Sequence, residues 1–401
     1  MDKIILHIDV NNAFLSWSAV LLLKNGYKYD IREKYAIIGG DESKRHGIVL
    51  AKSPLAKKLG IKTADTIYSA RRKCPQLLVY PPNYKWYQTM SQALFKLLSN
   101  YTDDIEICSI DECFLDYTPI KHLYGDVHIF AKNIQKKILD KLGFTVNIGI
   151  ANNKLCAKMA SDFTKPNKIH TLYENEIKTK MLPLPINELY GIGKQTTIKL
   201  KQLNINTIND LAQYNVNILS KYFKNQAPKM IDLAKGIDER LVIKENSIRK
   251  GISNSITLSH NLIYKQEVYQ VLAEVGENLG IDLREEKKYA TVISVILKDK
   301  YFKSYSHQKK LKNATNITSE IINIAKELFD EMWDSEPIRL VGIRLDNLVS
   351  TVTYQLSLFE EIKRREKINK IDEVVDQLKK KYGSSIIKSS ATMGNTITKK
   401  Y

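Results

Sequence analysis

The strongest constraint on the fold is the alternation of short apolar runs with longer amphipathic stretches along the first 151 residues. The apolar runs are rich in β-branched residues and too short for typical helices, which predicts buried strands at 3–9 (KIILHID), 105–117 and 144–151. Helical spacing predicts helices at 12–24, 84–101 and 126–142. Alternating elements of this kind favour an α/β or α+β core.

The chain is long enough for several domains, and the pattern changes along it. After Pro183 and Pro185 we expect short helices with tight glycine turns up to about residue 243, followed by a polar linker at 244–250. A second mixed region comes next. Its predicted strands lie near 251–258, 290–298 and 338–346, and its predicted helices near 266–285 and 318–333.

The chain is basic, with 62 Lys and Arg against 44 Asp and Glu, a formal net charge of +18. This excess indicates a partner with extended negative charge, nucleic acid first and an anionic membrane second. A lysine-rich genome composition is the alternative explanation. The basic excess is spread along the chain, so no single basic tail accounts for it.

The four cysteines form no CxxC pair and have no nearby histidine pattern, which argues against a zinc site or a disulfide framework. No apolar stretch approaches the length needed to span a membrane. Together these features predict a cytoplasmic protein that is neither exported nor membrane-bound.

Three carboxylates lie at or within the predicted core strands: Asp9, Asp111 and Glu112. Nucleotidyl transfer uses two divalent cations about 3.5 to 4 Å apart, and such hard cations prefer oxygen ligands. The alternative is that Asp9 caps the following helix and Asp111 pairs with a lysine. Neighbours in a regular strand face opposite ways, so Asp111 and Glu112 can share a metal site only if a turn or bulge lies at these two residues.

HIDVNNAF (7–14) and SIDE (109–112) resemble the two metal-binding motifs of Y-family DNA polymerases. The resemblance continues in order along residues 3–350. The further matching segments are 149–167 (GIANNKLCAKMASDFTKPN), Gly191-Ile192-Gly193, 251–258 and 338–348. An ordered series of matches is more specific than a carboxylate triplet, which many nucleases and phosphatases share.

The resemblance implies an α+β multidomain fold shaped like a right hand. Its expected parts are the palm and fingers in 1–180 (fingers about 25–82), the thumb with a helix-hairpin-helix in 181–245, the little finger in 246–350 and a tail in 351–401. The implied reaction is low-fidelity, template-directed DNA synthesis past lesions, on primer-template DNA with deoxynucleoside triphosphates (dNTPs). No residues remain for a proofreading nuclease domain of ordinary size.

The resemblance also implies roles for the carboxylates. Asp9 and Asp111 would bridge two Mg²⁺ ions, with Mn²⁺ as a possible substitute, and Glu112 would support the catalytic ion. The Val10 carbonyl would be a further ligand. A hairpin at SIDE is implied as well, and it would remove the geometric objection.

For the incoming nucleotide, Phe14 matches the family's steric gate, which excludes a ribose 2′-hydroxyl; a plain core aromatic is the alternative. Backbone N–H groups of Asn12, Ala13 and Phe14 at a strand-to-helix turn are suitable triphosphate donors. Lys165 matches the family's triphosphate lysine. Lys154 and Lys158, one turn apart, are either further phosphate ligands or exposed surface lysines.

The fingers depart from the family pattern. Where the family often has Tyr-x-Ala-Arg, this chain has Pro54-Leu55-Ala56-Lys57. Lys57 can still attract phosphate as a point charge, but it lacks the bidentate geometry of arginine. The departure puts the affinity for the incoming nucleotide in doubt.

Two segments are candidates for gripping DNA. GIGK (191–194), with Gly191, Gly193 and Lys194, resembles a helix-hairpin-helix whose free N–H groups meet a phosphate, although a simple helix cap is the commoner explanation. Residues 298–312 carry six lysines against one acid, including Lys298, Lys300 and Lys303. We expect a strand pair or loop there that holds the DNA backbone, with a solvated hairpin as the alternative.

QLSLF (355–359) resembles the peptide by which bacterial polymerases dock on the sliding clamp, the β clamp. Gln355, Leu356, Leu358 and Phe359 are the expected contacts, and an edge strand or helix start is the alternative. In many relatives this motif lies close to the chain end, yet here 42 residues follow it. They are predicted to include a helix with one face formed by Ile368, Ile371, Val375, Leu378 and Tyr382.

Two other functions compete with DNA synthesis. A catalytically silent DNA- or clamp-binding paralogue is favoured by the substitutions at Pro54 and Lys57, and opposed by the intact carboxylates. A two-metal nuclease would share the carboxylates, but it would need neither a bulky residue at Phe14 nor a clamp peptide.

Overall fold

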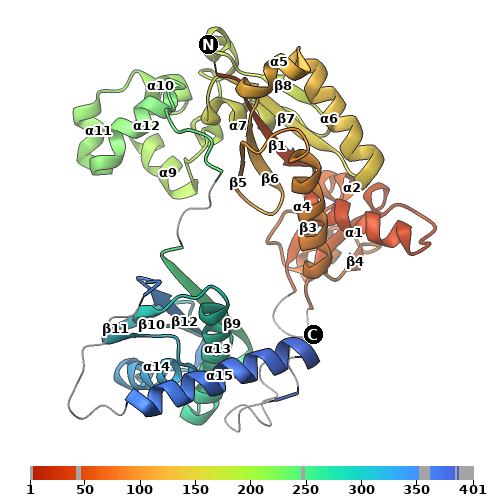
Figure 1. The fold of residues 1–401 in the computed structure, drawn as a ribbon. Helices are drawn as coiled ribbons and strands as arrows, with labels where there is room; N and C mark the ends of the chain where they lie inside the picture. Colours follow the sequence, from red (N-terminus) through yellow and green to blue (C-terminus); the bar gives the residue numbers. More distant parts are fainter. Residues whose placement is uncertain (1–2, 42–46, 245–248, 352–361, 384–385, 388–401) are drawn as a thin grey trace. The chain divides into compact units, whose positions relative to one another are not determined.

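The computed structural model describes residues 3–41, 47–244, 249–351, 362–383 and 386–387. The chain divides into two compact units, and the division falls at residues 246 and 247, within the polar segment 244–250. Both units combine strands and helices (Figure 1), as the sequence predicted.

A five-stranded sheet forms the centre of the first unit, in the order β5-β6-β1-β7-β8. Its strands are β1 (Ile5–Val10), β5 (Ile105–Ile107), β6 (Glu112–Asp116), β7 (Val146–Ala151) and β8 (Ile169–Thr171). β1 pairs antiparallel with both β6 and β7, and all six of its residues are buried. A continuous apolar strand buried on both sides explains the KIILHI run.

Helices cover both faces of this sheet. α1 (Ala13–Lys24), α4 (Tyr84–Leu98) and α6 (Val127–Leu142) share one core with Leu6, Ile8 and Val10 of β1. α7 (Lys154–Asp162) contributes to a second core that contains Ile5. Side chains alternate along a strand, so His7 and Asp9 lie on the same face of β1 as Ile5.

The apolar segment 105–117 forms two strands with a tight turn between them. The N–H groups of Cys108 and Ser109 both donate to the Glu112 carbonyl, over 3.1 and 3.3 Å. β5 and β6 are therefore the two arms of a hairpin whose turn contains Asp111. The hairpin implied by the resemblance is present. The prediction of one strand over 105–117 is wrong, because the turn divides this segment into β5 and β6.

A smaller sheet lies within residues 36–80, in the order β3-β2-β4. Its strands are β2 (Ala36–Gly39), β3 (Val49–Lys52) and β4 (Leu78–Tyr80), and α2 (Pro54–Lys58) and α3 (Ile67–Lys73) accompany them. Residues of α1 and β2 share a core through Leu15 and Ile38, so this small sheet is packed onto the start of the first helix.

Short helices complete the first unit, and those after residue 182 were predicted. After α5 (Lys121–Tyr124) and α8 (Glu174–Lys180) come α9 (Lys194–Gln202), α10 (Ile208–Ala212), α11 (Val216–Phe223) and α12 (Ala227–Ala234). Apolar residues of α9 to α12 share a core with α7, so this helical segment is packed against the α7 face of the large sheet.

The second unit contains a four-stranded antiparallel sheet in the order β11-β10-β12-β9. Its strands are β9 (Gly251–Leu262), β10 (Ala290–Asp299), β11 (Ser304–Thr315) and β12 (Ile338–Asp346), and its helices are α13 (Lys265–Glu285), α14 (Thr318–Met332) and α15 (Ile362–Tyr382). The lysine-rich segment 298–312 forms a strand pair, since β10 and β11 pair across a short turn.

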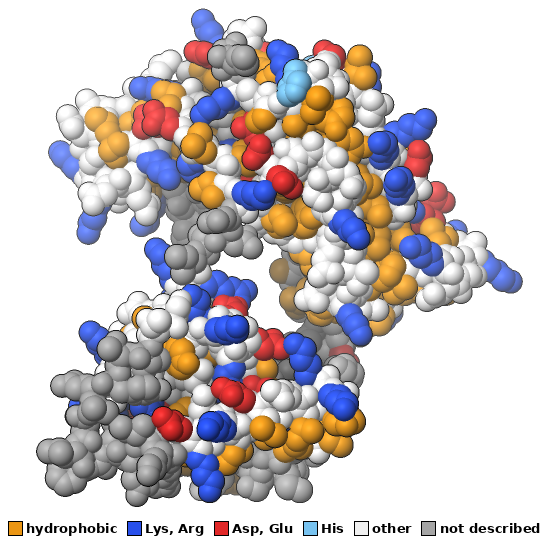
Figure 2. Space-filling view, in the orientation of Figure 1, with side chains coloured by type: hydrophobic (Ala, Val, Ile, Leu, Met, Phe, Trp, Pro, Cys, Tyr) orange, Lys and Arg blue, Asp and Glu red, His pale blue; other side chains and the backbone are white. Residues whose placement is uncertain are grey.

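Lys and Arg side chains are scattered over the visible face of both units, with Asp and Glu among them (Figure 2). This distribution agrees with a net charge of +18 that no single segment supplies. Across the described part of the chain, no helix combines the length and apolar character needed to cross a membrane.

Candidate active site

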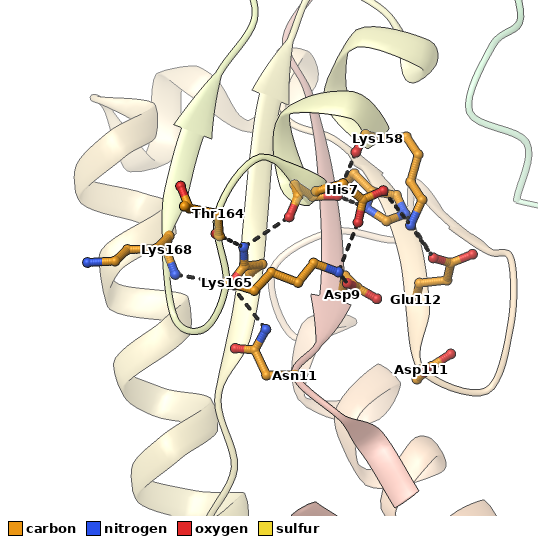
Figure 3. A network of polar contacts seen from close by, with 12 residues as sticks. His7, Asp9, Asn11, Asp111, Glu112, Lys158, Thr164, Lys165 and Lys168 are labelled. Atoms are coloured by element: carbon orange, nitrogen blue, oxygen red, sulfur yellow. Dashed lines mark hydrogen bonds and ion pairs between the residues drawn. The ribbon is translucent and has the colours of Figure 1, made fainter. Parts of the chain in front are cut away.

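The strand pairing brings the three carboxylates to one end of the large sheet. Asp9 lies directly opposite Glu112 in the β1–β6 register, and the Val10 N–H donates to the Asp111 carbonyl over 3.0 Å. Figure 3 shows the three residues on neighbouring segments at this end of the sheet. Because a turn lies directly before β6, the adjacent residues Asp111 and Glu112 can both contribute to one site.

Asp111 has little compensation for its charge. Ser109 Oγ donates to Asp111 Oδ1 over 2.6 Å. Burial raises the pKa of Asp111, and the negative charges of Asp9 and Glu112 raise it further. The pKa of Asp111 is therefore raised mainly by burial and in part by the neighbouring carboxylates, and a bound cation would oppose both effects by stabilising the ionised form.

Asp9 and Glu112 are each paired with a lysine. Lys165 forms an ion pair with Asp9 and a second with Asp162, the latter at 2.9 Å. Lys158 contacts Glu112 at 2.7 Å, and its pKa is raised by Asp9 and Glu112 although burial opposes this. Asp9 does not cap α1, because Asn12 is the residue before that helix.

His7 is a member of this site that sequence reasoning missed. It is fully buried beneath Glu112, with its Nε2 atom 3.5 Å from a Glu112 oxygen and its Nδ1 atom 2.8 Å from Ser161 Oγ. Burial lowers the pKa of His7, so the ring is neutral at pH 7. His7 and Lys158 together lower the pKa of Glu112 to about 2. Its position two residues before Asp9, on the same strand face, was the available signal.

The three carboxylates are candidate ligands for divalent cations. Among the described residues, no group of three His, Cys, Asp or Glu side chains is gathered closely enough to hold a metal ion as the side chains stand. The backbone nevertheless places three carboxylates together, two of them neutralised by lysines and the third with a raised pKa. Carboxylate oxygens are the ligands that hard cations require. The residues therefore fit such ions once the lysines release Asp9 and Glu112.

Phe14 lies in the first turn of α1 and is only partly buried. Its ring stacks on Tyr87 of α4 with a centroid distance of 4.6 Å and an interplanar angle of 9°. Tyr87 is fully buried, and its hydroxyl lies 2.7 Å from Ser18 Oγ. Phe14 is thus held from one side by a rigid aromatic while another part of its surface stays exposed.

Asn12 connects the start of α1 to the small sheet. It has a left-handed backbone (φ 52°), and its side chain donates to the Lys52 carbonyl over 2.7 Å instead of capping the helix. Lys57 is exposed on α2. Burial lowers the pKa of Lys52, and the positive charge of Lys57 lowers it further. Lys52 is a second candidate phosphate ligand that the sequence pattern did not reveal.

Both interpretations of Lys154, as a phosphate ligand and as an exposed surface lysine, are wrong. It is 4% exposed, and its Nζ lies 2.6 Å from both oxygens of Glu106 on β5. Glu106 also accepts the Ile243 N–H over 2.9 Å. Lys154 therefore connects α7 to the segment that follows the helical region. Lys158, one turn later, points to Glu112 instead.

The GIGK segment has the geometry of a helix entry. Gly191 has φ 93°, a conformation that side chains rarely adopt, and Gly193 is the N-cap of α9. Nothing lies within 4 Å of a Cβ placed on either glycine. Lys194, the first residue of α9, is exposed. The helix-cap interpretation is confirmed, and phosphate binding stays a prediction.

The lysine-rich hairpin of the second unit is exposed. Lys300 and Lys303 are exposed, and Lys298 is half-buried on β10. Asp299 holds the turn, since its Oδ1 accepts the N–H groups of Tyr301 and Lys303 over 2.8 and 2.9 Å. The single acid among the six lysines therefore shapes the turn.

The expected clamp contacts Gln355, Leu356, Leu358 and Phe359 lie outside the described residues. The predicted helix after them is confirmed as α15, but its face is only partly covered. Ile368, Val375 and Leu378 are half-buried, while Ile371 and Tyr382 are 52% and 59% exposed. Buried charges secure this helix instead: Arg284 of α13 is bound to Asp372 and Asp376 over 3.2 and 2.6 Å.

Comparison with known proteins gives consistent matches. Residues 8–162 match the impB/mucB/samB family, and residues 249–358 match the impB/mucB/samB family C-terminal domain. DNA polymerase IV of Clostridium acetobutylicum is 47% identical, with 98% of this chain and 99% of that protein covered. DNA polymerase IV of Acetivibrio thermocellus is 33% identical, with 96% of each chain covered.

Among solved structures, a Y-family DNA polymerase chimera of Dbh and Dpo4 matches with a TM-score of 0.73 and 25% identity. The match covers 87% of this chain and 100% of the chimera.

Proposed function

Because this chain belongs to the Y family of DNA polymerases, we propose that it extends a primer opposite damaged template bases, with Asp9, Asp111 and Glu112 as its metal ligands. The chain is a DNA-directed DNA polymerase, and its substrates are primer-template DNA and dNTPs. The observation that supports the site is the register that sets Asp9 opposite Glu112 beside the Asp111 turn.

The carboxylates and the Val10 carbonyl would hold two Mg²⁺ ions, with Mn²⁺ as a substitute. Such ions activate the attacking 3′ oxygen and neutralise the triphosphate during nucleotidyl transfer. With cations bound to Asp9, Lys165 would no longer be needed as its partner and would be available to bind the triphosphate.

Lys52 and Lys57 are the proposed phosphate ligands from the small sheet, and the N–H groups of Asn12 to Phe14 are the proposed ligands from α1. The bond from Asn12 to the Lys52 carbonyl supports this grouping, because it joins the two segments directly. Phe14, held by Tyr87, is the proposed steric gate. A half-exposed ring on a rigid support suits the exclusion of a ribose 2′-hydroxyl.

The second unit is proposed to grip duplex DNA through Lys298, Lys300 and Lys303. The segment with Gly191, Gly193 and Lys194 is proposed to contact the DNA backbone at another place. QLSLF is proposed to dock on the sliding clamp. Synthesis of this kind tolerates damage at the cost of accuracy, and we place it in the cytoplasm, where bacterial chromosomes are copied.

Primer extension on a labelled hairpin tests the proposal. Asp111→Ala should abolish extension and leave duplex binding within a few-fold, because a metal ligand acts on the transition state more than on phosphate contacts. Asp140→Ala, an exposed acid on α6, is the matched control and should extend normally. Shortened products would indicate a nuclease, and binding without extension by the wild type would indicate a silent paralogue. Extension by Asp111→Ala at saturating Mg²⁺ would falsify the metal assignment.

A further inference from the structure

A pair of buried amide side chains lies behind the loop that carries Lys165. Asn147 on β7 is fully buried, and Asn11, immediately after β1, is 7% exposed. Asn11 Nδ2 donates to Asn147 Oδ1 over 3.1 Å. Figure 3 shows Asn11 close to Lys165 and Asp9.

Asn147 uses all of its hydrogen-bonding capacity on one segment and on Asn11. Its Nδ2 group donates to the carbonyls of Ser161 and Thr164 over 2.9 and 2.7 Å. Its Oδ1 accepts the Lys168 N–H over 3.1 Å in addition to the bond from Asn11. A primary amide has two donors and two lone pairs, so every one is occupied.

Asn11 fastens the same segment from the other side. Its Oδ1 accepts the Asn167 N–H over 2.8 Å and the Thr145 hydroxyl over 3.0 Å. The two amides together therefore bind the backbone of residues 161, 164, 167 and 168. Lys165 lies between these points, with the nearest of them one residue before it and two residues after it.

We infer that Asn147 and Asn11 are positioning residues for Lys165: they fix the backbone on both sides of this lysine, so that its ammonium group reaches the carboxylates and the triphosphate of the incoming nucleotide. A lysine side chain has a flexible four-carbon stem, so the position of its ammonium group is restricted only if its backbone is fixed. Buried amides are suited to this, because their geometry is rigid and their loss leaves backbone groups without partners. The inference rests on the proposed function, since Lys165 is taken as a triphosphate ligand.

The pair also explains why polar residues occupy these buried positions. In β7 (VNIGIA), Asn147 is the one polar residue in a strand whose residues are all buried. An apolar residue there would pack as well in the sheet, but it could not hold the backbone of the 161–168 segment. Specific hydrogen bonding, and not strand stability, accounts for the asparagine.

The test is a double-mutant cycle between Asn147→Ser and Lys165→Ala in the full-length protein, measured by single-nucleotide extension. Asn147→Ser should raise the KM for dNTP about tenfold and change kcat less, with duplex affinity unchanged. If Asn147 acts through Lys165, adding Asn147→Ser to Lys165→Ala should cause little further loss. Asn133→Ser, an exposed asparagine on α6, is the matched control and should behave as the wild type.

Additive effects in the cycle, or a loss of duplex binding instead of dNTP affinity, would overturn the inference. If Asn147→Ser fails to fold, Asn11→Ala replaces it in the same cycle, because it releases Asn167 and leaves the Asn147 bonds to Ser161 and Thr164 intact. Hydrogen exchange of residues 161–168 should rise in either variant. A wild-type protein that does not extend a primer would refute the proposed function itself, whereas extension with an additive cycle would refute this inference alone.

Discussion

Replacing Lys154 with alanine tests whether its ion pair with Glu106 holds the segment after the helical region onto the large sheet. Lys154 Nζ lies 2.6 Å from both Glu106 oxygens and 3.3 Å from the Leu241 carbonyl, and it is also 5.0 Å from the centre of the Phe114 ring. Its side chain is 6% exposed and that of Glu106 is 25% exposed. The substitution would therefore leave a mostly covered carboxylate without its cation.

The expected loss follows from this burial. Removing one partner of a buried ion pair costs about 3 to 5 kcal/mol. Water can reach part of Glu106, which reduces the cost, so we expect Lys154→Ala to lower the free energy of unfolding by about 2 to 4 kcal/mol. The Ile243 N–H also binds Glu106, so hydrogen exchange in residues 238–244 should accelerate.

Urea unfolding provides the measurement. Trp17 and Trp86 report on the first unit, and a Trp333→Phe background removes the signal of the second unit. Lys136→Ala, an exposed lysine on α6, is the matched control and should change stability by less than about 0.5 kcal/mol. A double-mutant cycle with Glu106→Gln should give a coupling energy of at least about 1 kcal/mol. The reasoning fails if Lys154→Ala is as stable as Lys136→Ala.

Four further predictions concern function and the C-terminal helix. Phe14→Ala should raise incorporation of ribonucleotides relative to deoxynucleotides by about tenfold or more, since selectivity comes from a steric clash; equal discrimination by both enzymes would make Phe14 a core residue only. Lys57→Arg should lower the KM for dNTP about fivefold by restoring bidentate phosphate contact, and an unchanged KM would exclude Lys57 from the pocket. Replacing Leu358 and Phe359 with alanine should leave extension on short oligonucleotides unchanged and remove stimulation by the loaded clamp on primed circular DNA; equal stimulation would favour a structural tail. Arg284→Ala should increase hydrogen exchange across α15, because Asp372 and Asp376 lose their partner, whereas Lys380→Ala, at a side chain 83% exposed, should not.

The fold class and most elements could be predicted from local pattern. The buried strand ending near Asp9, the helices around 84–101 and 126–142, and three of the four strands of the second unit were anticipated, because each has an apolar period that suits one kind of element. For β11 (Ser304–Thr315) the sequence left a strand pair or a loop open. The ordered motifs also identified the family, which the comparisons confirmed. The domain boundaries and the residue roles stay predictions.

The sequence could not determine which side chains pair with one another in the folded protein. Lys154 and Lys158 lie one turn apart on the same helix and look equivalent in the sequence, yet Lys154 binds Glu106 and Lys158 binds Glu112. His7 reads as one more residue of a buried strand until the register sets it beneath Glu112. Lys52 belongs to none of the sequence motifs, and only the structure shows that its backbone carbonyl accepts the Asn12 side chain at the start of α1.

The sequence by itself determined where strands and helices form and which residue types carry the chemistry, because both depend on side chains that are neighbours along the chain. Only the tertiary structure decided that Asp9 lies opposite Glu112 in the pairing of β1 with β6 and that Asn11 and Asn147 meet across the sheet. It also decided that Arg284 binds Asp376 of α15. These contacts join residues up to 136 positions apart in the case of the amide pair. Their formation depends on the register of strands and the packing of whole elements, which no local pattern records.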